Sequence, residues 1–184
     1  MNAGKELRSL RDRPFELLKE LDRRSRASQH GQEGAGSGSG EWVGVAIRSA
    51  GQQWLVPRDE VREIMEFPPT TRVPGARDWV RGITNVRGRL VPVVDLLAFN
   101  SEGPTDVGRA SRLIVVNHAE IPAAILVDEV MGFRRFAANE FLAAAETADD
   151  GGFVLGRCRR GKEEWPVLSL AGLVESSRFS DVAA

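Results

Sequence analysis

The chain has 184 residues, of which 42% are hydrophobic and 28% are charged, and its formal net charge is −1. This length suffices for one ordinary domain or two small subdomains with a core. A net charge near zero provides no long-range field that would gather DNA, RNA or an anionic membrane. The single cysteine, Cys158, excludes an internal disulfide. No apolar run approaches the roughly 20 residues that cross a bilayer, and the N-terminal 30 residues lack the apolar centre of a signal peptide. We therefore expect a cytoplasmic protein without direct membrane insertion.

The N-terminal segment, residues 1–30, has leucines spaced as on one face of a helix, at positions 7, 10, 17, 18 and 21. Pro14 is compatible with the first turn of such a helix. We expect either an accessory helix that docks on the rest of the chain or a helix that binds a partner, because an isolated helix of this length is marginal in water. Residues 31–41, "GQEGAGSGSGE", are typical of a flexible linker.

Residues 42–175 predict an all-β domain, followed by a C-terminal tail at 176–184. Short runs rich in valine, isoleucine, leucine and tryptophan alternate with turn residues, which favours a sandwich or small barrels. The predicted strands are "WVGVAI", "QWLV", "RLVPVV", "RLIVVN", "AAILV", "GFVLG" and "WPVLSL". Helix signals are few and short, and the best of them is "ANEFLAAAE" at 138–146.

A weak internal repeat supports two copies of one small β unit. Residues 58–67 resemble 127–136, with the Asp-Glu-Val of 59–61 aligned on that of 128–130. Residues 82–96 resemble 156–170, with a glycine, a proline and a leucine at matching places. We expect two related units with linked edges or a groove between them.

The residues needed for catalysis or metal binding are scarce. Apart from acidic side chains, the chain offers only His30, His118 and Cys158, whereas a zinc site needs three or four ligands at short spacings. His118 is typical of a turn histidine. The arginines around Cys158 could activate its thiol, but no base accompanies it, which favours an ordinary surface or half-buried cysteine. We expect no enzyme, no cofactor and no metal.

Two kinds of binding remain open. A small β-barrel that binds single-stranded nucleic acid needs exposed aromatic side chains among basic ones, yet aromatic residues make up 7% of the chain and tyrosine is absent. A protein-binding domain would use a turn such as Arg87-Gly88, because arginine in a glycine turn has no packing reason to be arginine and is favoured at interface centres. The second interpretation fits better.

The stretch "WVRGITNVRGRLVPVVDLLAF" (79–99) resembles the signature segment of the CheW family, the adaptor proteins of bacterial chemosensory arrays. "VPRDEVREIMEFPPTTRVPGARDWVRG" before it and "RLIVVNHAEIPAAILVDEVMGF" after it are also similar to that family. The resemblance implies two SH3-like, five-stranded β-barrel subdomains. "PFELLKELDRRSR", "KEEWPVLS" and the final "FSDVAA" are similar to the subgroup that serves type IV pili and twitching motility.

The resemblance also implies a function and a site. A non-enzymatic adaptor would couple the cytoplasmic tip of a methyl-accepting chemoreceptor to the regulatory domain of a histidine kinase of the CheA type. The alternatives are a flagellar-type chemotaxis adaptor and, more remotely, the nucleic-acid binder. The family's motif implies partner contacts at Val61, Glu63, Gly82, Asn85, Val86, Arg87 and Gly88, with Glu63 near Arg87.

Overall fold

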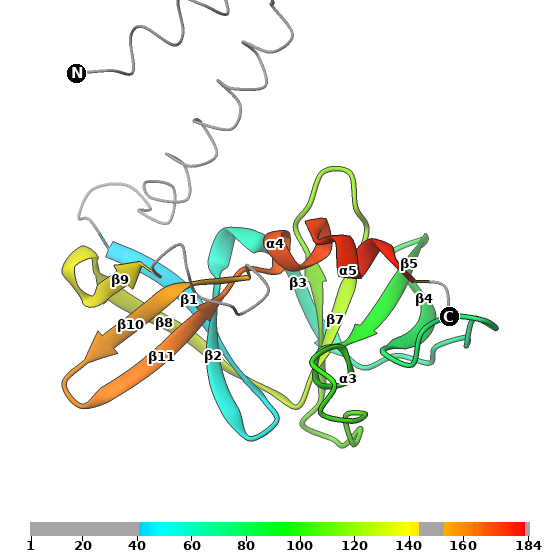
Figure 1. The fold of residues 1–184 in the computed structure, drawn as a ribbon, viewed down its shortest axis with the longest axis horizontal. Coiled ribbons are helices and arrows are strands. Elements are labelled where there is room, and N and C mark those ends of the chain that lie inside the picture. Colours follow the sequence, from blue (N-terminus) through cyan, green and yellow to red (C-terminus); the bar gives the residue numbers. More distant parts are fainter. Residues whose placement is uncertain (1–40, 144–152, 183–184) are drawn as a thin grey trace, which may run out of the picture.

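The computed structural model describes residues 41–143 and 153–182, and the expected N-terminal helix and its linker therefore lie almost wholly outside the described residues. The described part is mostly β (Figure 1). Its strands are β1 (Glu41–Ser49), β2 (Gln52–Pro57), β3 (Val61–Glu66), β4 (Val80–Val86), β5 (Arg89–Asp95), β6 (Arg112–Val116), β7 (Ala124–Val127), β8 (Glu129–Ala137), β9 (Phe141–Ala143), β10 (Val154–Arg160) and β11 (Glu163–Leu168). The short helices are α3 (Leu96–Phe99), α4 (Leu170–Glu175) and α5 (Ser177–Ser180), with 3₁₀ turns η1 (Arg58–Glu60) and η2 (Ala138–Glu140). Within these ranges no helix is long and apolar enough to cross a membrane.

The strands form two mixed sheets that stand beside each other in Figure 1. The five-stranded sheet has the order β3-β6-β7-β5-β4, and the six-stranded sheet has the order β8-β1-β2-β11-β10-β9. Most pairs are antiparallel, while β5–β7 and β2–β11 are parallel. We expected five strands in each unit. The sixth strand arises because the chain turns through η2 after β8 and adds the short β9 to β10.

The two edges of the five-stranded sheet are joined to each other. Thr71, on the segment that follows edge strand β3, forms an isolated bridge with Ile83 of the other edge strand, β4. Each residue donates its backbone N–H to the carbonyl of the other over 2.8 Å. The segment after β3 therefore crosses to the opposite edge of the sheet and pairs there with one residue of β4.

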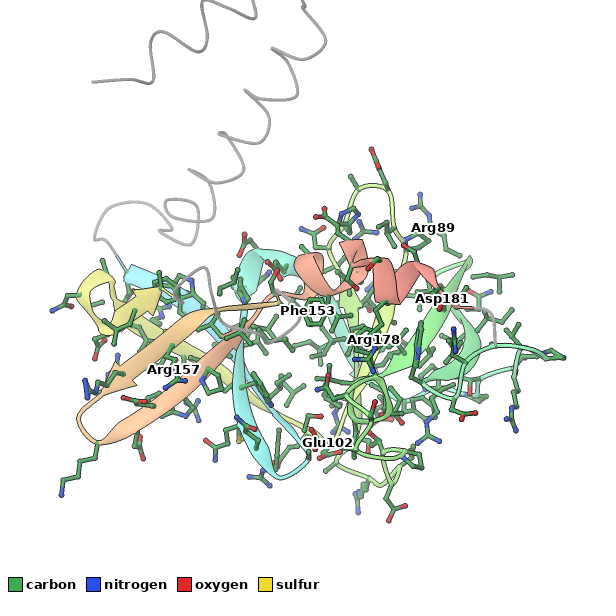
Figure 2. The ribbon with its side chains drawn as sticks, in the orientation of Figure 1. Arg89, Glu102, Phe153, Arg157, Arg178 and Asp181 are labelled. Atoms are coloured by element: carbon green, nitrogen blue, oxygen red, sulfur yellow. The ribbon has the colours of Figure 1, made fainter. Side chains whose placement is uncertain are left out.

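The core consists of three apolar clusters, of which one lies within each sheet and the third is shared by both sheets. Strands that are buried on both faces divide their side chains between two of these clusters. On β6, Leu113 and Val115 pack inside the curve of the five-stranded sheet, while Ile114 and Val116 face a large cluster shared by both sheets. Phe153, labelled between the sheets in Figure 2, belongs to that shared cluster. Burial on both faces explains why β6 and β7 appear in the sequence as continuous apolar runs.

The second part of the internal repeat matches the structure. Gly82 and Gly156 both lie at register shifts in the first strand of a hairpin, with φ of +137° and +152°. An added Cβ would lie 2.3 Å from the Thr71 carbonyl oxygen at the first glycine and 2.2 Å from that of Leu142 at the second. After each hairpin a polar side chain, Asp95 or Ser169, caps the helix that follows.

The first part of the repeat also falls at equivalent places, because one Asp-Glu-Val leads into edge strand β3 after β2 and the other leads into edge strand β8 after β7. The local backbone differs, since Asp59 and Glu60 lie in η1 whereas Asp128 lies in a bend and Glu129 begins β8.

One sequence-based expectation was wrong. The expected helix at 138–146 has the η2 turn at 138–140 and then strand β9, while 144–146 lie outside the described residues. Phe141 explains the change, because it pairs with Cys158 of β10 and stacks on Trp42 at 6.1 Å.

Candidate functional site

The hairpin of β4 and β5 ends in the two-residue turn Arg87-Gly88. Both residues have positive φ, +51° and +85°, as a type I′ hairpin turn requires. The side-chain Oδ1 of Asn85 accepts the Gly88 N–H over 2.7 Å and fixes the turn from inside. Glycine adopts this conformation freely, but arginine does so at a cost. A strained arginine at an exposed tip points to selection for its side chain rather than for its backbone.

Glu63 of β3 holds the Arg87 guanidinium in one pose. Arg87 Nε donates to Glu63 Oε2 over 2.7 Å, and Nη2 donates to Oε1 over 2.9 Å. The hydrogen bonds from Arg87 lower the pKa of the Glu63 carboxyl and raise the pKa of the guanidinium. The Arg87 side chain is still 80% exposed, against 28% for Glu63. The pair therefore stays charged near neutral pH and presents a fixed arginine to the solvent.

A cleft of about 190 Å³ lies beside this ion pair. Its floor is apolar, and arginines from β3 and β5 stand at its rim. The lining residues are Arg62, Glu63, Val86, Arg87, Arg89, Val91, Val115, Val116, Pro122 and Ala123. Leu90, next to the turn, is 67% exposed. An apolar depression with a fixed arginine on its rim is the arrangement found at centres of protein interfaces.

The structure divides the seven expected contact residues into two groups. Glu63, Asn85, Arg87 and Gly88 lie together at the surface around the turn. The other three are buried. Val61 belongs to the cluster shared by both sheets, Val86 packs inside the five-stranded sheet, and Gly82 occupies the bulge in β4. Val86 also lines the cleft, whereas Val61 and Gly82 are not among its lining residues.

Several residues of the cleft were not expected from the sequence. Arg62 and Arg89 are sequence neighbours of expected contact residues, and this adjacency is the one sequence signal that points to them. Pro122 and Ala123 come from the loop between β6 and β7, which approaches the motif through the pairing of β3 with β6. Only tertiary structure brings this loop to the site.

Of the three groups considered for chemistry, His30 lies outside the described residues, and Cys158 and His118 lie apart, in a strand of one sheet and a loop of the other. Cys158 is buried, and burial raises the pKa of its thiol to about 12, against which the nearby Arg160 acts only weakly. Within the described ranges, no three histidine, cysteine, aspartate or glutamate side chains gather in a way that would hold a metal ion. His118 lies in the loop after β6 and binds backbone groups of that loop, as expected of a turn histidine.

Comparison with known proteins adds to this geometry. The model of the CheW-like domain family matches residues 44–178. Protein PilI of Pseudomonas aeruginosa is 34% identical to the chain, over 92% of the chain and 96% of PilI. Protein FrzA of Myxococcus xanthus is 33% identical, over 70% of the chain and 82% of FrzA. The crystal structure of the scaffolding protein TtCheW from Thermoanaerobacter tengcongensis superposes with a TM-score of 0.66 at 23% identity, covering 74% of the chain and 94% of TtCheW, and thus has the same fold.

Proposed function

The chain belongs to the CheW-like family of non-enzymatic coupling proteins, and from this premise we propose that it links the tip of a methyl-accepting chemoreceptor to the regulatory domain of a CheA-type histidine kinase. We place this linkage in the cytoplasm, at a membrane-associated chemosensory array that controls type IV pili and twitching motility. On this proposal each sheet is an SH3-like barrel, and residues 1–30 are an extension specific to the pilus system.

One observation carries the proposal: a bidentate ion pair fixes Arg87 in an exposed turn beside an apolar cleft. A partner with an apolar side chain and an acidic neighbour would fill the cleft and pair with the guanidinium. Because Glu63 occupies one edge of the guanidinium fork, the partner would take the remaining N–H donors. The buried Val61, Gly82 and Val86 would hold the turn in place.

The choice of the pilus system rests on how far the matches extend. The match to PilI covers about 169 of the 184 residues. Residues 41–184 can supply at most 144 of these, so the match includes at least about 25 of the first 40 residues. The match to FrzA covers 70% of the chain and requires none of them. Resemblance that continues into the N-terminal segment favours a PilI-like role over a flagellar one.

A titration against the regulatory domains of a pilus-type and a flagellar-type kinase tests both parts of the proposal. We expect tighter binding to the pilus-type kinase domain. Arg87→Ala and Glu63→Ala are expected to weaken binding of a soluble receptor-tip fragment about tenfold or more while the kinase remains bound. Arg134→Ala, at an exposed position of β8, is the matched control. Binding to neither kinase would remove the adaptor function, and preference for the flagellar kinase would select the alternative.

The nucleic-acid alternative loses support. In the described ranges Phe133 is the sole aromatic among the exposed large hydrophobic side chains, whereas Trp79 near the Arg87 hairpin is buried. Single-strand binding depends on several exposed rings that stack on successive bases.

A further inference from the structure

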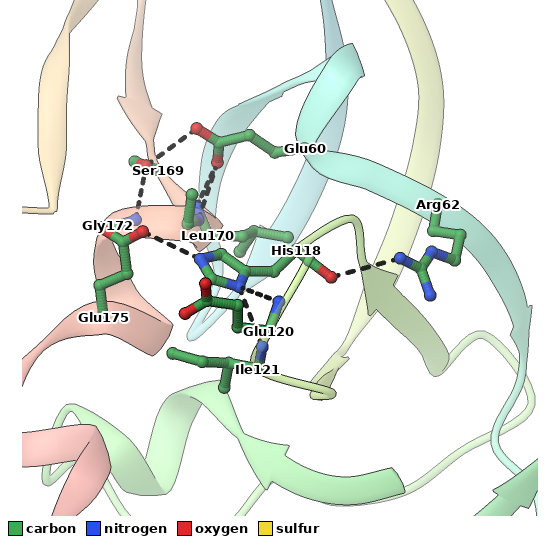
Figure 3. Close-up of polar contacts among 10 residues, drawn as sticks. Glu60, Arg62, His118, Glu120, Ile121, Ser169, Leu170, Gly172 and Glu175 are labelled. Atoms are coloured by element: carbon green, nitrogen blue, oxygen red, sulfur yellow. Dashed lines mark hydrogen bonds and ion pairs between the residues drawn. The ribbon is translucent and has the colours of Figure 1, made fainter. Parts of the chain in front are cut away.

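His118 lies where the loop between β6 and β7 meets helix α4 (Figure 3). Its Nδ1 accepts two backbone N–H groups of its own loop, from Glu120 over 3.2 Å and from Ile121 over 3.0 Å. Its Nε2 lies 2.9 Å from Oε1 of Glu175 on α4. Because Nδ1 accepts twice, the ring is neutral and carries its proton on Nε2, which donates it to Glu175.

These contacts set the shape of the loop that forms one wall of the Arg87 cleft. The two N–H bonds to Nδ1 fold residues 118–121 into a tight turn, and the Ile121 side chain packs against the shared core. The next two residues, Pro122 and Ala123, line the cleft. Across the cleft rim, Arg62 Nη2 donates to the His118 carbonyl over 3.3 Å. One residue therefore connects a rim arginine, a cleft wall and helix α4.

We propose that His118 is a positioning residue for the partner site, and that adding a proton to its Nδ1 opens the β6–β7 loop and weakens partner binding. The inference rests on the proposed function, because it concerns the same cleft. A new N–H on Nδ1 would point at two N–H donors, so both bonds must break before the charged ring can exist in this place.

The charged groups around His118 do not offset this loss. Glu175 attracts a charged ring, but it lies at Nε2, whereas Nδ1 points toward the N–H groups of its own loop, so Glu175 gives a proton on Nδ1 no acceptor. Arg62, from β3, binds the carbonyl of His118 and adds positive charge on that side. Glu60, from η1, is committed to α4, where it accepts from Ser169 Oγ and the N–H groups of Leu170 and Ala171. Glu120 is on the loop itself and is exposed.

Two substitutions separate the two contacts of the ring. In His118→Asn the short amide places an oxygen near Nδ1, where it can accept the same N–H groups as an Asx turn does. In His118→Gln the longer amide reaches toward Glu175 and leaves the turn without its acceptor. Binding of the receptor-tip fragment is measured for both variants and the wild type at several pH values between roughly pH 8 and pH 5.5.

The expected result is a wild-type affinity that falls about fivefold in acid, the equivalent of one lost hydrogen bond. His118→Asn should bind within about twofold of the wild type at pH 8 and should not show the fivefold loss of affinity in acid. His118→Gln should bind about fivefold more weakly than the wild type already at pH 8. An acid effect of equal size in the wild type and His118→Asn would overturn the proposal.

A second measurement needs no partner. Hydrogen exchange at the amides of Glu120 and Ile121 should show protection in the wild type at pH 8, retained in His118→Asn and lost in His118→Gln. Protection that does not depend on residue 118 would refute the positioning role, even if the adaptor function holds. Conversely, the expected exchange pattern with no receptor or kinase binding would leave the loop mechanism intact and refute the proposed function.

Discussion

Arg87 occupies a turn position whose backbone conformation is unfavourable for arginine. A type I′ turn favours Asn-Gly, and here its first position is occupied by arginine with φ of +51°. The ion pair with Glu63 lies in solvent, where such pairs contribute little to stability. The ion pair therefore offsets only part of the destabilisation that the strained Arg87 backbone causes.

Arg87→Asn should separate folding from function, because it restores the preferred Asn-Gly turn and removes the guanidinium. We expect its midpoint of urea unfolding to equal or exceed that of the wild type, while affinity for the receptor-tip fragment falls about tenfold or more. Arg87→Lys keeps the charge without the planar fork and should bind between the two. A clear drop in the unfolding midpoint of Arg87→Asn would mean that the ion pair, rather than the turn, holds the hairpin.

Gly82 has the opposite role, since its conformation and its surroundings both exclude a side chain. With φ of +137° and the Thr71 oxygen 2.3 Å from an added Cβ, Gly82→Ala would break the bridge that joins the two sheet edges. We expect a loss of about 2–4 kcal/mol in the free energy of unfolding. Gly88→Ala is the control, because nothing lies within 4 Å of its added Cβ, and it should cost about 1–2 kcal/mol from its positive φ alone. Equal costs would show that the close contact at Gly82 relaxes freely.

At the scale of the elements, local pattern predicted strands well where both faces are buried. The apolar runs of β6 and β7 were recognised, and so was the exposed Arg87-Gly88 turn. Strands β3 and β8 were not predicted, because charged residues interrupt their apolar pattern. A helix was predicted over β9, because its alanines and glutamates follow a helical pattern, but pairing with β10 makes residues 141–143 a strand. The cleft wall at Pro122 carries no local signal at all.

The second hairpin, β10–β11, has an ion pair of its own, which predicts a pH dependence. Glu140 accepts from Arg160 Nε and Nη2 and from the Ala137 N–H, each over 2.8 Å. The Arg160 hydrogen bonds, followed by the Ala137 N–H, lower the pKa of Glu140 from 4.5 to about 2. A lowered carboxyl pKa stabilises the fold fully above pH 4.5, and this stabilisation is lost as the pH falls toward 2.

Glu140→Gln should therefore unfold at a lower temperature than the wild type at pH 7, and the difference should shrink steadily between pH 4.5 and pH 2. Thermal unfolding of both proteins across this range provides the measurement. Glu163→Gln, on the neighbouring strand, controls for the loss of one carboxylate. A difference that is constant with pH would mean that Glu140 acts through packing and not through its charge.

At the scale of the whole molecule, the two repeats are interlocked. Strands β1 and β2 come from the first repeat, but they share a sheet with β8–β11 of the second. Strands β3–β5 of the first repeat share the other sheet with β6 and β7 of the second. The sequence repeat predicted two similar units, and no local pattern revealed this exchange, because it depends on pairings between strands far apart in the chain.

Interlocking implies that neither repeat folds alone. Fragments 41–106 and 107–182 each retain about half of the shared apolar cluster, and each would expose strands whose partners lie on the other fragment. An exposed apolar face and unpaired edges cannot offset the entropy of ordering the chain. We expect each fragment to lack a cooperative thermal transition in circular dichroism, and the equimolar mixture to recover one. Cooperative melting of a single fragment would show that one repeat can rebuild a sheet without the other. In the intact chain, the same exchange means that the Arg87 hairpin and the His118 loop, which come from different repeats, meet in one sheet, so the proposed partner site exists only when both repeats are folded.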